Sequence, residues 1–381
     1  MMRRFGIVLL AGIIACLTCC KQAGSFDGDV ICGDDAVDMP FESVATDISL
    51  HALECDRLVD AFDAAVIGDN LFVLDSELSQ LWCFQDNRLV STLAAQGRGH
   101  GEYSLIADFD YLPENGTLFI VPREANVVLK YEYPSMRYAG QYAFDGYIHG
   151  LRVVDGNTFI VRCNTDSLSN IVALWDASTG KITETLQLIS AQNLYFEPNY
   201  SLHNPFRLVS GLADFTNRLG WFDENGEFTE LYSFRYSDGK PKDIYSISSD
   251  TEDFSLILKR TQFETQKHFF SNVVMPLVTE DGFSFWYCNN NGPEGDDSWL
   301  WLYNKTAEGV LQAKNLSIPG LNFVVQPMGV TQDGRYFTIF SGPSDMIEDP
   351  NTSPSALARQ ILDAVNSQKD DNPVILYFRI K

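Results

Sequence analysis

Dipeptides that favour tight turns recur along this chain, and each stands directly before a run of aromatic and branched apolar residues. Turns with Gly next to Asn or Asp supply the positive φ angles that a short hairpin needs, and the residues that follow favour strands. A further apolar strand pattern comes after each of these runs. The chain therefore predicts a repeated unit of short antiparallel strands, marked by Gly68-Asp69, Asn115-Gly116, Asp155-Gly156, Asp281-Gly282 and Asp333-Gly334.

The length of the unit indicates the kind of repeat. Residues 41–381 divide among six units of about 57 residues, near the length of a four-stranded propeller blade. Residues 205–236 form a fourth, less regular unit, and the Gly-His and Trp-Asp marks of WD40 blades do not recur from unit to unit. We therefore predict an all-β fold, a six-bladed β-propeller of four-stranded antiparallel blades.

The two ends of the repeat region predict how the ring closes. The chain stops just after the strand pattern at 374–380, so the sixth unit lacks its outermost strand. The alternating stretch Val44 to Leu53 is available to fill that place. We expect the first and last strands of the body to pair in one blade.

One helix pattern interrupts the strands. Ser353-Pro354 precedes Ala356 to Asn366, where apolar residues recur at helical spacing, so we predict a helical insertion near 353–367. Two interpretations stand open for this insertion. It is either a decoration of the surface, or a lid or partner-docking element over the mouth of the central funnel.

The N-terminus has the features of an exported, lipid-anchored protein. Arg3-Arg4 followed by an apolar run to Leu17 is typical of a secretory signal, which we place at residues 1–20. Leu17 stands three residues before Cys20, as in the lipobox of bacterial lipoproteins, so we predict lipidation of Cys20 and a membrane partner. Residues 21–40, rich in glycine and aspartate, are predicted to be a flexible acidic tether ahead of a folded body at 41–381.

The net charge limits the kinds of partner that the protein can bind, and the positions of the cysteines limit the disulfides that it can form. The formal net charge is −24, which argues against nucleic acid and anionic membrane surfaces as partners, because both require a basic surface. Most of the cysteines beyond Cys20 lie in apolar strand patterns, and we predict that they are small buried residues of the core. A disulfide between Cys32 and Cys55 is the one pairing that export would permit.

The chain resembles a known family over its whole length. The lipobox, the run Gly97-Arg98-Gly99-His100-Gly101-Glu102-Tyr103 and the closing run at 371–377 resemble the six-bladed TolB-like and NHL-like propeller lipoproteins of Bacteroidetes. In that family's glycine motif a proline usually stands where this chain has His100. The resemblance implies a propeller at the bacterial outer membrane, facing the periplasm or the surface, and it implies no settled reaction.

The sequence offers little support for an enzyme. The glycine-rich run at 97–101 leads into a strand, so it lacks the helix N-terminus of a phosphate site, and it reads as a connection between blades that requires glycine. Serine hydrolase and HExxH motifs are absent from the sequence. No catalytic residue and no cofactor is assigned.

A metal site remains the alternative hypothesis. Several histidines each fall close to the first strand of a predicted blade, and such connectors converge on one face of a propeller. His149, His203 and His268 could meet there as ligands of a divalent metal, which would support a metal-dependent lyase or hydrolase.

The preferred hypothesis is a binding module that uses the same face. There the connectors and the loops between second and third strands would form a mixed polar and aromatic rim. Aromatic rings stack on apolar faces of sugars or side chains, while amides and charged groups fix orientation. We expect a glycan, a peptide or another envelope protein as the partner, bound by Tyr103, Arg123, Tyr147, Asp166 and Asn290.

Overall fold

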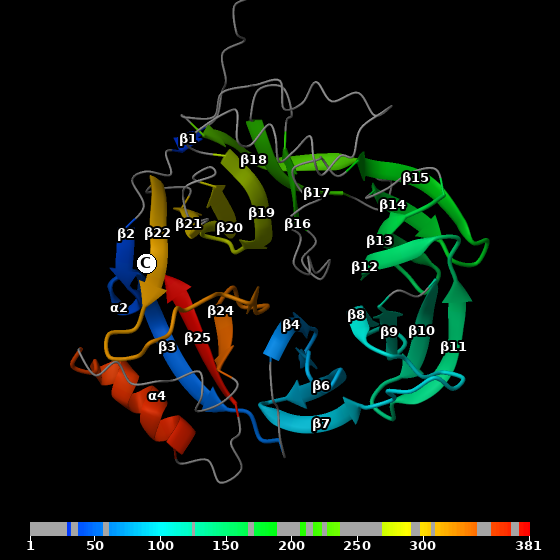
Figure 1. Cartoon of the computed structure of the whole chain (residues 1–381), viewed down its shortest axis with the longest axis horizontal. Helices are drawn as coiled ribbons and strands as arrows, with labels where there is room; N and C mark the ends of the chain where they lie inside the picture. The colour runs from blue at the N-terminus through cyan, green and yellow to red at the C-terminus, as the bar shows by residue number, and fades with distance from the viewer. Residues whose placement is uncertain are drawn as a thin grey trace, which may run out of the picture.

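A computed structural model gives the architecture of the chain. It describes residues 29–31, 37–55, 61–123, 126–166, 171–188, 206–210, 216–222, 227–236, 269–290, 298–305, 309–340, 352–366 and 373–381. Within them, six separate sheets surround a common centre (Figure 1). We number these sheets as blades 1 to 6 in the order in which their inner strands follow along the chain.

The first three blades are regular meanders in which consecutive strands pair antiparallel. Blade 1 contains β4 (Ala61–Ile67), β5 (Asn70–Asp75), β6 (Gln80–Gln85) and β7 (Arg88–Leu93). Blade 2 contains β8 (Ile106–Leu112), β9 (Thr117–Pro122), β10 (Val127–Glu132) and β11 (Arg137–Ala143). Blade 3 contains β12 (Tyr147–Val153), β13 (Thr158–Asn164), β14 (Ile171–Asp176) and β15 (Lys181–Leu188).

The other three blades each include a strand from the N-terminal part of the chain. Blade 4 contains β16 (Phe206–Ser210), β17 (Thr216–Phe222), β18 (Phe228–Tyr236) and β1 (Asp29–Ile31). Blade 5 contains β19 (Phe269–Val278), β20 (Gly282–Asn290), β21 (Ser298–Lys305), β22 (Gly309–Ser317) and β2 (Val37–Pro40). Blade 6 contains β23 (Gly329–Val330), β24 (Tyr336–Phe340), β25 (Val374–Ile380) and β3 (Ala45–Ala52), which follows the short helix α2 (Phe41–Val44).

The predicted pairing of the two ends is confirmed. The strand β3 lies antiparallel to the C-terminal strand β25, with Ala52 opposite Val374 and Ala45 opposite Ile380. The strand β25 is apolar and buried along most of its length, while β3 is mostly exposed or half-buried, as an outermost strand is. The N-terminal strand thus supplies the outermost strand that the sixth repeat lacks.

The predicted tether at 21–40 is wrong for two short stretches. Residues 29–31 pair parallel with β18, and residues 37–40 pair parallel with β22. An outermost strand carries backbone N–H and C=O groups that lack partners on one side, and a short extended segment satisfies them. The acidic, glycine-rich composition did not reveal this pairing, because it depends on the backbone rather than on side chains.

The hydrophobic core consists of layers between neighbouring blades rather than one central cluster. The strands β8, β9 and β10 send Phe109, Leu118 and Leu129 toward blade 1, while Phe119, Val121 and Val128 pack on blade 3. Strands buried on both faces read as continuous apolar runs, as the sequences of β5 and β9 do. Blade 2 is therefore held by both of its neighbours.

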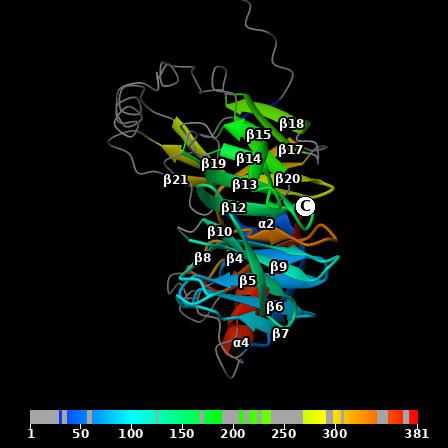
Figure 2. The ribbon, with the colours of Figure 1, turned by 90° about the vertical axis from the view of Figure 1, so that its right-hand side faces the viewer.

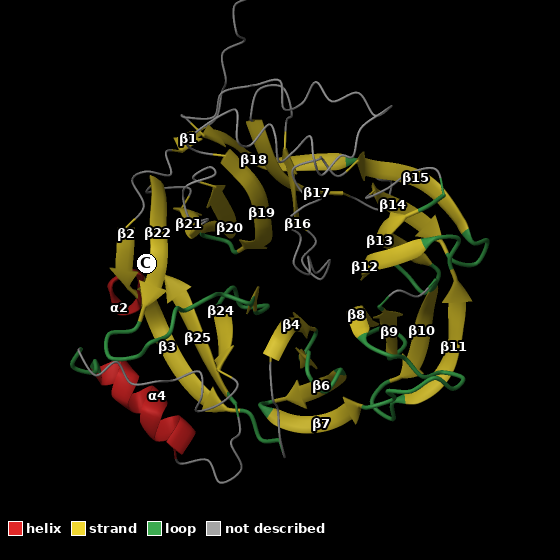
Figure 3. Ribbon diagram, viewed as in Figure 1, coloured by secondary structure: helices red, strands yellow, loops and turns green. Residues whose placement is uncertain are grey.

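The predicted helix forms as α4 (Ala356–Asn366) and decorates the outside of the ring. Its buried residues, Leu357, Ala358, Ile361 and Val365, pack on the core shared with β3 and β25. Figure 3 shows the helix outside blade 6, and Figure 2 shows it within the thickness of the ring rather than above either face. The interpretation as a lid over the funnel is therefore wrong. Its N-terminus is capped by Ser355, whose Oγ accepts a bond from the N–H of Ala358 (3.1 Å), and not by Ser353.

No helix among the described residues is both long and apolar enough to cross a bilayer.

Candidate functional site

The glycine-rich run at 97–103 forms the connection between blades 1 and 2. The Oε2 atom of Glu102 accepts a 2.6 Å hydrogen bond from the N–H of Gly99. A Cβ atom at Gly97 would lie 2.0 Å from that same oxygen, so a side chain there would displace the Glu102 carboxylate and its bond to Gly99. Gly101 has φ +77°, and the Tyr131 hydroxyl donates to its carbonyl oxygen. This geometry fits the prediction of a connection that requires glycine.

Tyr103 belongs to this connection and not to a binding rim. Its side chain is 2% exposed and packs in the core between blades 1 and 2. Its hydroxyl donates to the carbonyl oxygen of Leu93 (3.1 Å) and accepts from the N–H of Ala95 (3.3 Å). The prediction of Tyr103 as a ligand-binding residue is therefore wrong. A ring that ends a tight turn is buried here because its hydroxyl finds backbone partners inside the core.

The inner strands of the first three blades share a β-bulge at the same position. In each strand one extra residue precedes the point where regular pairing resumes, and two residues then face one on the next strand. Asp63 pairs with Leu74 after the bulge in blade 1, and Asp108 pairs with Val121 in blade 2. Bulges of this kind redirect side chains and are frequent near functional sites.

Blade 3 departs from this pattern at the bulge itself. Gly150 stands where blades 1 and 2 have an aspartate, and it pairs with Arg162 instead of an aliphatic residue. The extra residue is His149, so His149 and Gly150 together face Arg162. Gly150 has no side chain, and Arg162, which pairs with it, is buried at 7% exposure.

His149 and Arg162 form the electrostatic centre of this region. Burial lowers the pKa of the half-buried His149 imidazole below its ordinary value, and the positive charge of Arg162 lowers it further. The imidazole is therefore neutral at pH 7 and has a free electron pair on one nitrogen. It can accept a hydrogen bond from a ligand hydroxyl or amide. A second cation close to it, such as a divalent metal, would be repelled by the guanidinium.

Tyr147 presents an exposed ring beside this pair. It lies two residues before His149 on the same strand, and its pairing partner, Asn164, lies two residues after Arg162 on β13. Residues two apart in a strand share a face, so the four side chains belong to one face of blade 3. The opposite face carries Ile148, Leu151, Val161 and Cys163, which pack against blade 2.

The approach of the two strands at Tyr147 requires glycine. Gly146 has φ +133°, and a Cβ atom there would lie 2.1 Å from the carbonyl oxygen of Asn164. Asp166 lies two residues beyond Asn164, just after the end of β13, and is exposed. We call Tyr147, His149, Arg162, Asn164 and Asp166 the third-blade site.

The structure places the remaining predicted residues elsewhere or leaves them undescribed. Arg123 is exposed at the end of β9, and its N–H donates to the carbonyl oxygen of Leu105 (2.8 Å). Asn290 ends β20 opposite Phe269, and its side chain is not among those described. His203, His268 and Cys20 lie outside the described residues. Within the described ranges no group of three or more metal-ligating side chains comes together.

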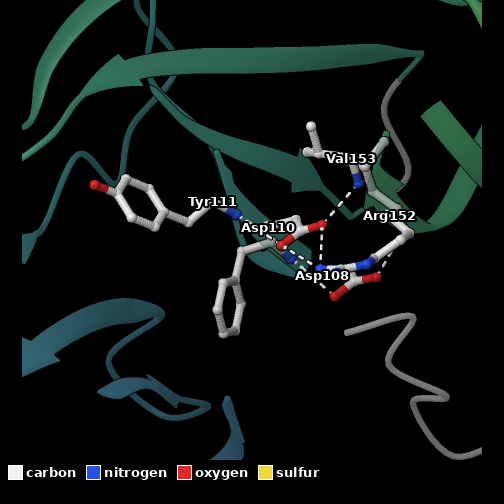
Figure 4. A network of polar contacts seen from close by, with 7 residues as sticks. Asp108, Asp110, Tyr111, Arg152 and Val153 are labelled. Carbon is white, nitrogen blue, oxygen red and sulfur yellow. Dashed lines mark hydrogen bonds and ion pairs between the residues drawn. The ribbon is translucent and has the colours of Figure 1, made fainter. Parts of the chain in front are cut away.

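Two carboxylates that the sequence analysis passed over position the inner strand of the site. Figure 4 shows Asp108 and Asp110 of β8 reaching across to β12. Asp108 accepts from the N–H of Leu151 (2.8 Å), and Asp110 accepts from the N–H of Val153 (2.7 Å) and from Arg152 (3.1 Å). Both carboxylates are almost fully buried, at 1% and 0% exposure. The signal was available, since two aspartates alternate with apolar residues inside a strand, where a charge needs a partner.

Comparison with known proteins agrees with this architecture. Residues 40–195 match a family model, DUF5128, described as a 6-bladed beta-propeller. The chain is a six-bladed β-propeller. The resemblance found in the sequence is thereby confirmed for the fold.

Solved structures are similar to this chain at low identity, and the first of them shares its fold. A putative exported protein from Bacteroides fragilis is 16% identical, with a TM-score of 0.64, and the match covers 91% of this chain and 98% of that one. A member of the DUF4221 family from Bacteroides vulgatus is 10% identical, with a TM-score of 0.43 over 89% and 98% of the two chains. Virginiamycin B lyase from Staphylococcus aureus is 9% identical, with a TM-score of 0.37 over 87% and 99%. These likenesses concern the fold alone. The search of curated proteins found no match.

Proposed function

We propose that this propeller is a saccharide-binding protein of the bacterial cell envelope, anchored by a lipid on Cys20, and that it binds its ligand at the third-blade site. The observation that carries the proposal is the exposure of Tyr147, which reaches 53%. Among the described residues it is the only aromatic side chain in the set of large exposed apolar residues. The others, such as Val37, Val90 and Leu231, lie on outermost strands or their neighbours.

The chemistry around Tyr147 suits a sugar. An exposed ring stacks on the apolar C–H face of a pyranose, and the polar groups beside it bond the hydroxyls that surround that face. Asn164 offers an amide, Asp166 a carboxylate, and neutral His149 an acceptor within the same face of the blade. A peptide ligand would need further apolar contacts to replace the hydroxyl bonds, which makes it the second candidate.

The binding test compares two exposed side chains. Mature protein is passed over arrays of neutral and acidic oligosaccharides and of peptides, as wild type, Tyr147→Ala and Val90→Ala. Val90 is 43% exposed but lies on the outer strand β7, so its removal controls for a general loss of apolar surface. We expect oligosaccharide binding that weakens about tenfold or more in Tyr147→Ala, as loss of one stacked ring predicts, and stays unchanged in Val90→Ala. Binding that both variants retain, or that only peptides show, would contradict the proposal.

The anchor is tested separately. The leader of 20 residues, its two arginines and the Leu17 to Cys20 spacing support lipidation at Cys20. Cells fed an alkyne fatty acid should label the wild-type protein and the Cys19→Ser variant, while Cys20→Ser should lose the label and leave the membrane fraction. A label that survives in Cys20→Ser would place the lipid elsewhere or show that Cys20 is not the anchor.

A further inference from the structure

The N-terminal segment touches four of the six blades in succession. We call residues 29–31 and 37–55 the N-terminal strap. Its first part pairs with β18 of blade 4, its second with β22 of blade 5, and its third, β3, with β25 of blade 6. Glu54 then forms a parallel bridge with Arg88 on the outer strand of blade 1. Figure 1 shows the blue segments β2 and β3 following the outside of the ring.

Side chains fasten the strap along this path. The Asn315 amide donates to the Asp38 carboxylate (2.7 Å). Phe41 is fully buried, and its ring meets that of Phe378 edge to face. The amino group of Lys381, the last residue, donates to the carbonyl oxygens of Glu42 and Ser43 (both 3.1 Å). The strap is thus attached to the far end of the chain by backbone pairing, aromatic packing and charge-assisted hydrogen bonds.

Two consecutive residues of the strap join the two sides of the junction between blades 6 and 1. The N–H of Leu53 donates to the carbonyl oxygen of Pro373 in blade 6 (2.9 Å). The N–H of Glu54 donates to the carbonyl oxygen of Asn87 in blade 1 (2.8 Å), and the Glu54 carbonyl accepts from the N–H of Leu89 (3.1 Å). Leu53 itself is fully buried in the apolar layer between these two blades.

This junction differs from the neighbouring ones in how it is held. Blades 1 and 2 share the glycine-rich connection and a bond from the N–H of Ile106 to Ser79, and blades 2 and 3 share the two buried aspartates. At the junction of blades 6 and 1 the covalent path runs through the strap, because β3 of blade 6 is followed along the chain by β4 of blade 1. Beyond the strap, the junction relies on apolar packing such as that of Phe337 and Ile375 on Leu53 and Phe84.

We propose that residues 53–55 act as a latch, and that the ring opens at the junction of blades 6 and 1 when this latch releases. The proposal goes beyond the pairing of β3 with β25, because it assigns the opening point to the Leu53–Glu54 bonds rather than to the last blade. Local opening occurs where few interactions must be lost, and on the blade 1 side the backbone bonds of the strap, within the described residues, are the two made by Glu54. The strap also precedes its partners β22 and β25 along the chain, so β3 can pair with β25 only after β25 has been made.

The test uses the full mature chain and two substitutions at one position. Glu54→Pro removes the N–H that bonds Asn87, while Glu54→Ala keeps it and removes only the exposed ion pair with Arg88 (3.5 Å). Native-state hydrogen exchange is followed in β4 and β25 at the junction and in β9 and β13 as references. We expect the amides of β4 and β25 to exchange about tenfold faster in Glu54→Pro than in Glu54→Ala, because one backbone hydrogen bond is lost. The amides of β9 and β13 should exchange equally fast in the two variants.

Hydrogen exchange of the wild-type protein provides a second test, which does not depend on whether the proline variant folds. At low urea, amides of β3, β4 and β25 should exchange through a smaller opening than those of β9 and β13. Equal exchange in the two Glu54 variants would overturn the latch. So would junction amides that exchange only in the global unfolding that also exposes β9 and β13.

Discussion

The carboxylate of Asp110 lies 2.7 Å from the backbone N–H of Val153, across the boundary between blades 2 and 3. The same carboxylate caps the N–H of Tyr111 on its own strand and pairs with Arg152. Together with Asp108 it satisfies N–H groups on the inner strand β12. The strand that carries Tyr147 and His149 is therefore held in place by two buried charges of the preceding blade.

Removing this carboxylate should weaken the fold strongly. Asp110→Ala leaves the N–H of Val153 and the Arg152 guanidinium without their acceptor, and breaking a buried ion pair typically costs about 3–5 kcal/mol. Urea unfolding of the two proteins measures the difference. Glu132→Ala is the matched control, because it removes an exposed pair with Arg137 and should cost below about 1 kcal/mol. Equal losses in the two variants would mean that the buried network contributes no more than a surface pair.

The glycine at the start of β12 should tolerate no side chain. In Gly146→Ala the new Cβ atom would overlap the carbonyl oxygen of Asn164, so one of the two strands must move. We expect a loss of about 2–4 kcal/mol in the free energy of unfolding and loss of ligand binding. Gly180 also has positive φ, but a Cβ there meets nothing within 4 Å. Gly180→Ala should cost about 1 kcal/mol by backbone strain alone and leave binding intact, and a Gly146→Ala variant as mild as this would contradict the tight approach.

His149 should make stability depend on pH. Its pKa in the folded protein is lowered by burial and then by Arg162, so below the ordinary value near 6.5 the unfolded chain binds the proton more readily than the folded one. The contribution of His149 to stability is therefore present above that pH and is lost as the pH falls through the folded pKa. When unfolding free energies are measured from pH 8 to pH 4, the wild type should therefore lose more stability than His149→Gln as the pH falls. Parallel curves would show that His149 is not perturbed.

Buried thiols should be inert in the native protein. Burial raises the pKa of Cys83 and of Cys163 to about 12, so neither forms the reactive thiolate at pH 8. Mass spectrometry after iodoacetamide treatment should find both unmodified in the folded protein and modified in urea. Modification of Cys163 without urea would mean that the core between blades 2 and 3 opens readily.

The repeat and its closure could be predicted from the sequence because they depend on local signals. Turn dipeptides such as Asn115-Gly116 mark hairpins directly, and the apolar spacing of α4 marks a helix. The pairing of β3 with β25 followed from counting strands in the last unit. These features need no knowledge of how one blade packs on the next.

The site was predicted in part, because its geometry depends on register and on neighbouring blades. From their place before an inner strand, the sequence singled out Tyr147 as a ligand-binding candidate and His149 as a metal-ligand candidate. The bulge that sets His149 and Gly150 against Arg162 appears only in the pairing of β12 with β13. Tyr103 was misplaced, since its burial follows from the turn at 97–101. The strands β1 and β2 were missed because backbone pairing at a sheet edge leaves little trace in composition.

The central claim, that the ligand binds at the third-blade site, is tested most directly by NMR of the histidine side chains. The chain has only five histidines, so the His149 imidazole signals can be assigned with His149→Gln. During titration with the oligosaccharide that the array selects, the His149 signals should shift in step with saturation. The signals of His51, which lies on β3 in blade 6, should stay fixed. Saturable binding that leaves the His149 signals unmoved would contradict the account and place the ligand elsewhere on the propeller.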